Sequence, residues 1–235
     1  PTYLGVALRT QDIMVLRIVN DNNWKRPVYF AVTVSPTSML NLDNYLQMEG
    51  LAYRLVNNSK DVINQEKMTE NLMNYIGDKL WFEDYDANKK NILKDSISKE
   101  YQRGYIYRNL ANPEVHVDPQ LGRLIQNYRT GFVRLSISHY LEKNFKQAEK
   151  ALLKMEEIMP SNVVPIPSKE LQYQIAQVYS GIGNQEKMKY HMKELVARKD
   201  LALSDYLLYG KTFIQSLEDF EESKLIFETI YQNYK

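Results

Sequence analysis

Histidine and carboxylate side chains are the residues of this sequence that could hold a metal ion or transfer protons. His116, His139 and His191 lie far apart along the chain, and none of them forms an HxH or HxxxH pair. The run Glu83-Asp84-x-Asp86 could contact calcium, but it lacks the glycine and the distal glutamate of an EF-hand loop. His139 falls where two predicted helices pack, which is typical of a structural histidine. We therefore expect no metal site.

Nucleophilic and cofactor-binding motifs are also missing from the sequence. There is no cysteine, and no glycine belongs to a GxGxxG, GxxxxGK or GxSxG motif. The carboxylate pairs Glu156-Glu157 and Glu221-Glu222 fall in predicted helices, where a solvated face is the ordinary explanation. We therefore expect no catalytic residue and no cofactor. An enzyme remains an alternative for residues 77–119, which carry aromatic residues and carboxylates without an assigned role.

The composition is that of an ordinary globular chain, with 235 residues, 44 % of them hydrophobic and 25 % charged. Lysine and arginine (30) nearly balance aspartate and glutamate (29), so the formal net charge is only +1. The overall charge therefore gives no indication of nucleic-acid binding. The longest uncharged stretch, residues 27–42, is broken by Pro36 and is too polar to span a membrane. Because the chain begins at Pro1 and shows no signal peptide, we expect a trimmed piece of a longer protein.

Residues 1–117 carry mixed signals and predict a small α+β portion. Thr10 can cap a helix, and the β-branched and aromatic run 28–34 predicts a buried strand. Residues 50–56 suggest a second strand, although a helix is also compatible, and 68–75 suggest a short helix. From residue 77 to 119 the aromatic residues indicate a long irregular connection held against the core.

Residues 118–235 change to a helical pattern that begins at Asp118-Pro119, with aspartate as the cap and proline at the first helical position. Within it a tetratricopeptide-like arrangement of small, aromatic and large apolar residues recurs three times. The corresponding positions Ala148, Met188 and Ser223 are 40 and 35 residues apart, against an ideal period of about 34. The first spacing is stretched by the proline-rich connection at 159–168. A plain helical bundle is the alternative, because periodicity alone does not separate the two.

The three predicted units draw on the following residues. The first contains Phe132, Leu135, Ser136, His139, Phe145, Ala148, Leu152, Met155 and Pro160; the second contains Ala176, Tyr179, Gly183, Met188, Met192 and Leu195; the third contains Tyr206, Tyr209, Gly210, Phe213, Phe220, Ser223, Phe227 and Ile230. We therefore predict an α+β, mostly α, chain in which the N-terminal portion packs on about three helical hairpins.

Arrays of this kind usually bind partners on the concave face formed by the first helix of each hairpin. That position predicts a partner-binding surface of Thr130, Val133, Tyr140, Tyr173, Gln177, Leu207 and Lys211. Several of the 18 tyrosines are used in hairpin packing, and the others are candidates for contact with a ligand.

Part of the sequence resembles a known family. The block Asn22-Asn23-Trp24-Lys25-Arg26-Pro27-Val28-Tyr29-Phe30-Ala31 is the most specific match, and residues 10–20, 42–56, 71–74 and 117–135 also fit. They resemble the C-terminal soluble region of large multi-pass membrane proteins common in Bacteroidetes, a former domain of unknown function. That family is similar to protein O-mannosyltransferases of the GT-C class.

The resemblance implies an extracytoplasmic, periplasmic tail of an integral membrane protein, whose membrane link lies in the missing N-terminal part. In GT-C enzymes the catalytic acid belongs to the membrane portion, so no catalytic residue is carried over to this chain. The expected function is non-catalytic binding of a protein partner, an acceptor polypeptide or a glycan. A freestanding tetratricopeptide adaptor is the alternative, and a purely structural tail is a further one. Asp95-Ser96-Ile97 resembles an O-glycosylation acceptor of that phylum, and Asn57-Asn58-Ser59 is an N-glycosylation sequon.

Overall fold

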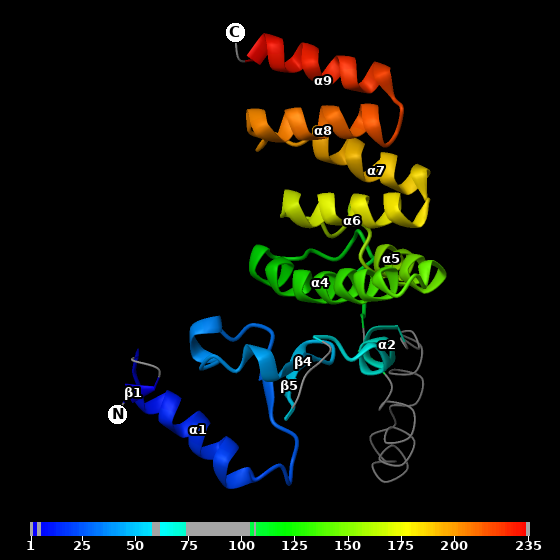
Figure 1. Ribbon diagram of the computed structural model, residues 1–235. Helices are drawn as coiled ribbons and strands as arrows, with labels where there is room; N and C mark the ends of the chain where they lie inside the picture. Colours follow the sequence, from blue (N-terminus) through cyan, green and yellow to red (C-terminus); the bar gives the residue numbers. More distant parts are fainter. Residues whose placement is uncertain (1, 4–5, 58–61, 74–103, 106, 234–235) are drawn as a thin grey trace. The chain divides into compact units, whose positions relative to one another are not determined.

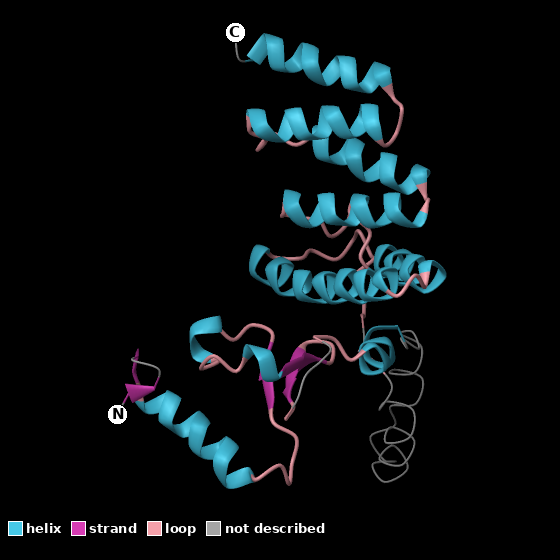
Figure 2. Cartoon of the chain, in the orientation of Figure 1, coloured by secondary structure: helices cyan, strands magenta, loops and turns pink. Residues whose placement is uncertain are grey.

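The computed structural model describes residues 2–3, 6–57, 62–73, 104–105 and 107–233. These residues are mostly helical, with a small antiparallel three-stranded sheet, as predicted for the fold class (Figure 2). They form two compact units, Pro1–Arg108 with Arg123–Gly131, and Asn109–Gly122 with Phe132–Lys235. The acidic run at 83–86, the acceptor-like sequence at 95–97 and most of the sequon at 57–59 lie outside the described residues.

Among the described residues, the first 108 positions of the N-terminal unit contain a short strand pair, helices α1 and α2, and the sheet. Its elements are β1 (Thr2–Tyr3), β2 (Val6–Ala7), α1 (Thr10–Asn22), β3 (Tyr29–Ala31), the 3-10 turns Pro36–Ser38 and Asp43–Tyr45, β4 (Leu46–Met48), β5 (Ala52–Leu55) and α2 (Gln65–Met73). The sheet order is β3-β5-β4, and both pairings are antiparallel. Both predicted strands are therefore present in shortened form, whereas β4 was not predicted. The prediction of a buried strand is wrong for β3, because only Phe30 is buried and its neighbours Tyr29 and Ala31 are exposed.

The core of the sheet region consists of Phe30, Met39, Leu46 and Leu55, with Val15 and Val19 of α1 packed against them. The start of α1 differs from the prediction, because Arg9 rather than Thr10 is the capping residue. The carboxylate of Asp12 accepts a 2.9 Å hydrogen bond from the backbone N–H of Arg9. The Arg9 guanidinium also donates to this carboxylate, and these bonds lower the pKa of Asp12.

Two tyrosines from the end of the predicted connection pack in the same unit. Tyr105 and Tyr107 make edge contacts with Tyr128, with ring centroids 5.4 and 5.3 Å apart. The hydroxyl of Tyr105 accepts a hydrogen bond from the backbone N–H of Leu51, and that of Tyr107 donates to the carbonyl of Leu72. For these two residues the predicted role of aromatic anchors is confirmed; the earlier aromatic residues of the connection lie outside the described ranges.

The helical half begins with α4 (Pro119–Leu141) in the manner predicted. The side chain of Asp118 accepts hydrogen bonds from the backbone N–H groups of Gln120 and Leu121, and Pro119 is the first helical residue. These hydrogen bonds lower the pKa of Asp118. The capping residue and the proline together fix where the helix starts.

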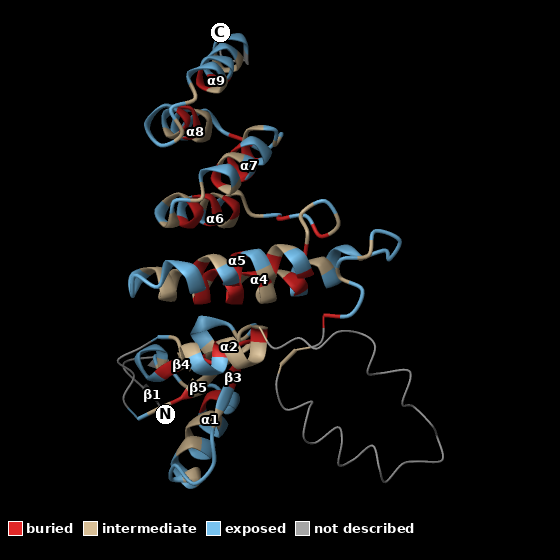
Figure 3. Cartoon of the chain, turned by 90° about the vertical axis from the view of Figure 1, so that its right-hand side faces the viewer, coloured by how far each residue is buried: buried red, intermediate tan, exposed pale blue. Residues whose placement is uncertain are grey.

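The helices that follow form hairpins. They are α5 (Phe145–Ile158), α6 (Lys169–Ile182), α7 (Gln185–Val196), α8 (Leu203–Gln215) and α9 (Phe220–Asn233). Helix α6 pairs with α7, and α8 pairs with α9, one hairpin after the other (Figure 1). Viewed from the side, α6 and α8 share one side of this unit and α7 lies on the other (Figure 3). The predicted helical hairpins are confirmed.

Small residues let the paired helices approach, as the repeat pattern requires. In the first hairpin Ser136 Oγ donates a 2.7 Å hydrogen bond to the carbonyl of Ala148, and in the third Ser223 Oγ donates a 3.0 Å bond to the carbonyl of Gly210. Both hydroxyls are buried. The turn between α6 and α7 uses Gly183 at φ 86°, a left-handed conformation that glycine adopts without strain.

Candidate binding surface on the helical repeats

The polar cluster around Glu156 connects the first two hairpins. Its carboxylate accepts hydrogen bonds from Tyr179 Oη at 2.7 Å, His191 Nε2 at 2.8 Å and Lys187 Nζ at 2.5 Å. Burial acts to raise the pKa of Glu156, but the hydrogen bonds from His191, Lys187 and Tyr179 together outweigh it and lower the pKa to about 2. Burial and the neighbouring Glu156 raise the pKa of Tyr179.

This cluster is built for packing rather than for proton transfer. His191 is only 1 % exposed. Its ring stacks on Tyr179 and meets the edge of Tyr190, with centroids 5.6 and 5.2 Å away. The three donors to Glu156 and the two tyrosine rings around His191 come from α6 and α7, whereas Glu156 belongs to α5. We interpret the cluster as a buried link between α5, α6 and α7.

A second buried carboxylate, Glu49, closes the β4–β5 hairpin. It accepts a 2.9 Å hydrogen bond from Tyr29 Oη and a 3.1 Å bond from Asn64 Nδ2, and Arg54 lies 3.5 Å away. The backbone carbonyl of Glu49 accepts from Asn71 Nδ2 of α2. These contacts connect β3, β5 and α2, so this carboxylate also has a structural role.

The other histidines and carboxylates were noted in the sequence as possible metal ligands. In the part of the chain that the structure describes, no three His, Asp or Glu side chains converge in a way that could hold a metal ion. Of the carboxylate pairs noted in the sequence, Glu157 pairs with Lys154 and Glu222 pairs with Lys193. Both are surface ion pairs, so Glu157 and Glu222 fit the predicted solvated helix faces. The same prediction is wrong for Glu156, whose side chain is only 18 % exposed and lies in the cluster described above.

The seven predicted surface residues fall into different environments. Val133 is 1 % exposed and therefore presents no surface to a partner. Tyr140 is half-buried; its ring lies 5.6 Å from that of Phe145 and against Gly181 of α6. Thr130 is half-buried on α4, outside the unit that holds the other six. Of these three residues, Thr130 and Tyr140 are partly exposed and only Val133 is buried.

The remaining four residues lie on α6 and α8. Tyr173 and Leu207 are the fifth residues of their helices, and Gln177 and Lys211 are the ninth. Tyr173 lies in the seam between the helices, with its ring 5.4 Å from that of Tyr209 and its hydroxyl 3.2 Å from Thr212 Oγ1. Gln177, Leu207 and Lys211 are exposed. We call the surface that includes Tyr173, Gln177, Leu203, Leu207, Lys211 and Ile214 the α6–α8 face.

Three exposed apolar residues of α8 were missed by the sequence analysis. Leu203 is 38 % exposed, Leu208 is 45 % exposed and Ile214 is 37 % exposed, beside Leu207 at 48 %. Leu203, Leu207 and Ile214 are spaced by four and seven residues, so they share one side of the helix. The core residues Tyr209 and Phe213 occupy a different side. A helical wheel of α8 shows two apolar sides, and this signal could have identified the surface.

The α6–α8 face carries an ion pair and, within the described part of the chain, a lysine without an ion-pair partner. Lys169 at the start of α6 and Asp205 at the start of α8 are 2.6 Å apart, and the hydrogen bond from Lys169 lowers the pKa of Asp205. Burial, together with Asp205 and Glu170, raises the pKa of Tyr209 to about 12. Lys211 has no ion-pair partner among the described residues. The face therefore offers aliphatic side chains around a lysine that is available to a carboxylate.

Comparison with known protein families identifies a match in the N-terminal part of the chain. Residues 3–76 match the family model of the TMEM260-associated domain 2, which covers about a third of the chain. The match indicates part of a membrane-associated protein. Among the described residues, no helix combines the length and the apolar character needed to cross a membrane. No curated protein and no solved structure matches the chain.

Proposed function

We propose that this chain is the non-catalytic, extracytoplasmic tail of a membrane glycosyltransferase-like protein, and that its α6–α8 face binds a polypeptide. The proposed location is the periplasmic side of a bacterial membrane. The observation that carries the binding function is the row of exposed aliphatic residues around Lys211 on α8. Solvent-exposed apolar side chains grouped on one helix face are typical of protein interaction sites. The match of residues 3–76 to a TMEM260-associated domain supports a membrane-associated parent protein.

A polypeptide fits this face better than a glycan does. Sugar rings stack on the flat faces of aromatic residues, and the aromatic residue of the face, Tyr173, already contacts Tyr209. The exposed residues Leu203, Leu207 and Ile214 are aliphatic and match apolar side chains of a peptide. Lys211 adds a preference for a carboxylate beside those apolar side chains. An acceptor polypeptide or another protein partner with Leu and Glu side chains has this chemistry.

Binding can be tested with fluorescein-labelled 15-residue peptides. One peptide carries Leu and Glu at helical spacing, and a matched peptide carries Lys in place of Glu. We expect the 235-residue chain to bind the Glu peptide with a dissociation constant of about 100 µM, as is common for transient peptide contacts. Leu207→Ser should weaken binding at least tenfold. Lys211→Glu should reverse the preference between the two peptides.

The control is Leu153→Ser, which changes a leucine of α5 that is 41 % exposed and lies outside the face. This variant should bind as the unchanged chain does. Melting followed by circular dichroism shows whether Leu207→Ser retains its fold. The proposal fails if neither peptide binds up to about 1 mM, if Leu153→Ser and Leu207→Ser have the same effect, or if a mannose oligosaccharide binds instead of the peptides.

A further inference from the structure

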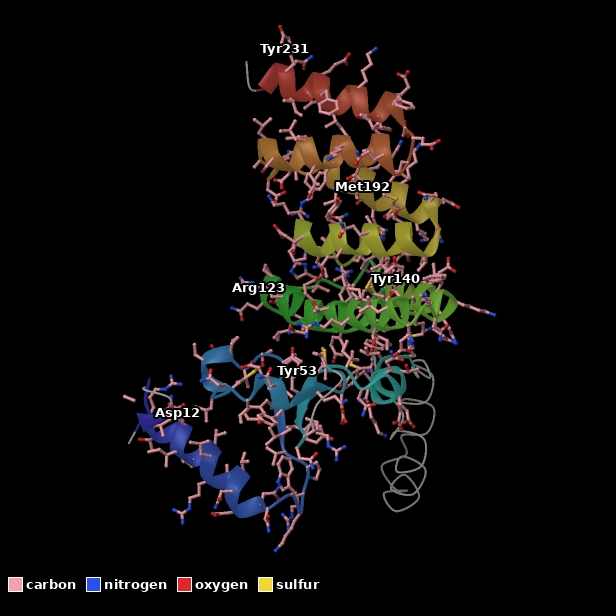
Figure 4. All side chains as sticks on the ribbon, viewed as in Figure 1. Asp12, Tyr53, Arg123, Tyr140, Met192 and Tyr231 are labelled. Carbon is pink, nitrogen blue, oxygen red and sulfur yellow. The ribbon has the colours of Figure 1, made fainter. Side chains whose placement is uncertain are left out.

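Helix α1 of the N-terminal unit presents apolar side chains to solvent as well as to the core. Val15 and Val19 pack against the core of the sheet region. Ile13, in contrast, is 41 % exposed, Met14 is 60 % exposed and Ile18 is 56 % exposed. Side chains extend from α1 and from the turn after it on the side away from the sheet (Figure 4). We define the α1 surface as these three exposed residues together with the turn residues Trp24, Lys25 and Arg26.

Trp24 is the most unusual residue of the α1 surface. It is the second residue after α1, and 58 % of it is exposed. Its backbone has φ 60°, in the left-handed region that a bulky side chain adopts only at a cost in free energy. A large ring held in a strained turn and left in solvent contributes little to the core. Such a position indicates a use outside the fold.

The charges around Trp24 favour an anionic partner. Lys25 and Arg26 directly follow the tryptophan and are exposed, and neither has an ion-pair partner among the described residues. Asp21, the exposed carboxylate of α1, lies 3.4 Å from the guanidinium of Arg17 and is therefore already paired. The α1 surface thus joins an exposed indole and exposed aliphatic side chains to two cations that are available to an anion.

This combination matches the surface of a membrane that contains anionic lipid. Indole rings prefer the level of the headgroups, aliphatic side chains enter the boundary with the acyl chains, and cations are attracted to anionic headgroups. The family match at residues 3–76 includes the whole α1 surface and indicates a membrane-associated protein. We propose that the α1 surface docks on an anionic membrane. The proposal rests on the membrane-associated parent of the proposed function, but not on peptide binding at the α6–α8 face.

Flotation with vesicles tests the docking directly. One set of vesicles is pure phosphatidylcholine, and in the other a third of the lipid is phosphatidylglycerol. We expect the 235-residue chain to be half bound at about 0.1 mM accessible lipid on the anionic vesicles, since a few apolar side chains bind marginally. Binding to the neutral vesicles should be about tenfold weaker or less, because each cation near an anionic surface strengthens binding about fivefold.

Trp24→Asn should weaken binding to the anionic vesicles at least tenfold. Asparagine accepts the left-handed backbone of this turn, so the substitution removes the ring without disturbing the turn. The matched control is Tyr45→Asn, because Tyr45 is an aromatic residue of the same unit, is 46 % exposed and lies outside the α1 surface. That variant should bind as the unchanged chain does. Circular dichroism checks that both variants are folded.

The charge requirement has its own test. Lys25→Glu should weaken binding to the anionic vesicles at least fivefold and leave binding to the neutral vesicles unchanged. Lys146→Glu, at an exposed position of α5, makes the same charge change outside the surface and should have no effect. The sequence contains two tryptophans, Trp24 and Trp81, so a Trp81→Phe chain reports on Trp24 alone. Its fluorescence should shift to shorter wavelength with the anionic vesicles.

Four results would overturn the proposal. They are binding that does not depend on phosphatidylglycerol, an unshifted emission of Trp24, equal losses for Trp24→Asn and Tyr45→Asn, and a change in sedimentation of the chain without vesicles on Trp24→Asn. The last result would show that a second copy of the chain covers this surface. Because peptide binding at the α6–α8 face is measured without vesicles, a chain that binds the peptide but not the vesicles contradicts only the docking of α1.

Discussion

Glu156→Gln should destabilise the helical repeats strongly at neutral pH and only weakly in acid. In the folded chain the pKa of Glu156 falls from its ordinary 4.5 to about 2. Each pKa unit corresponds to about 1.4 kcal/mol, so ionised Glu156 contributes about 3 kcal/mol at pH 7. Glutamine keeps the size of the side chain but turns an N–H group toward His191 or Lys187, which are themselves donors. The variant therefore loses the whole contribution of the carboxylate.

The sign of the pH dependence follows from the lowered pKa. The contribution is fully present above pH 4.5, the ordinary pKa, and is lost as the pH falls toward about 2, the folded-state pKa. At pH 3 about 1.4 kcal/mol of it should remain. Urea unfolding followed by circular dichroism at 222 nm, at pH 7 and at pH 3, measures the difference between the unchanged chain and the variant. That difference cancels the titration of the other carboxylates.

Glu157→Gln is the matched control, because Glu157 is the next residue of α5 and its carboxylate, 68 % exposed, pairs with Lys154. A surface pair of this kind contributes little, so its loss should be much smaller than that of Glu156→Gln. Two results would refute the reasoning: equal losses for the two variants at pH 7, or a loss for Glu156→Gln that is the same at pH 7 and pH 3.

Three further substitutions test the packing. Gly50→Ala should lower the free energy of unfolding of the N-terminal unit by more than about 2 kcal/mol, because Gly50 has φ 97° and a Cβ would collide with the Tyr105 ring; a loss below 1 kcal/mol in urea titrations would contradict this. Gly181→Ala should raise the free energy of unfolding by about 0.5–1 kcal/mol only in a chain that also carries Tyr140→Ala, because the new Cβ would otherwise lie 2.6 Å from the Tyr140 ring. Equal shifts in melting temperature with Tyr140 present and with Tyr140→Ala would refute this. Ser136→Ala should cost about 1 kcal/mol in chemical unfolding, the value of its buried 2.7 Å hydrogen bond to α5, and an unchanged midpoint would disprove that contribution.

The sequence predicted the repeats because their spacing is determined by local packing. Small residues at Ala148, Ala176 and Gly210 allow close approach, and all three are buried in the structure. The start of α4 was predictable because Asp118 and Pro119 satisfy the first N–H groups locally. The start of α1 was not predictable in this way. There Arg9 takes the capping position in place of the expected Thr10, and its backbone N–H bonds to the carboxylate of Asp12, three residues later. Strand β4 was missed because three residues are too few to show alternation.

The candidate surface was predicted only in part, because periodicity identifies a helix side but not what covers it. Val133, which the repeat pattern places at the same site as Leu207, is 1 % exposed, whereas Leu207 is 48 % exposed. The same limit applies to the second helices, where Phe145 and Phe220 match the aromatic position of the pattern and are nevertheless 44 % and 65 % exposed. Exposure at a repeat position depends on the neighbouring hairpin, which no short window of sequence contains.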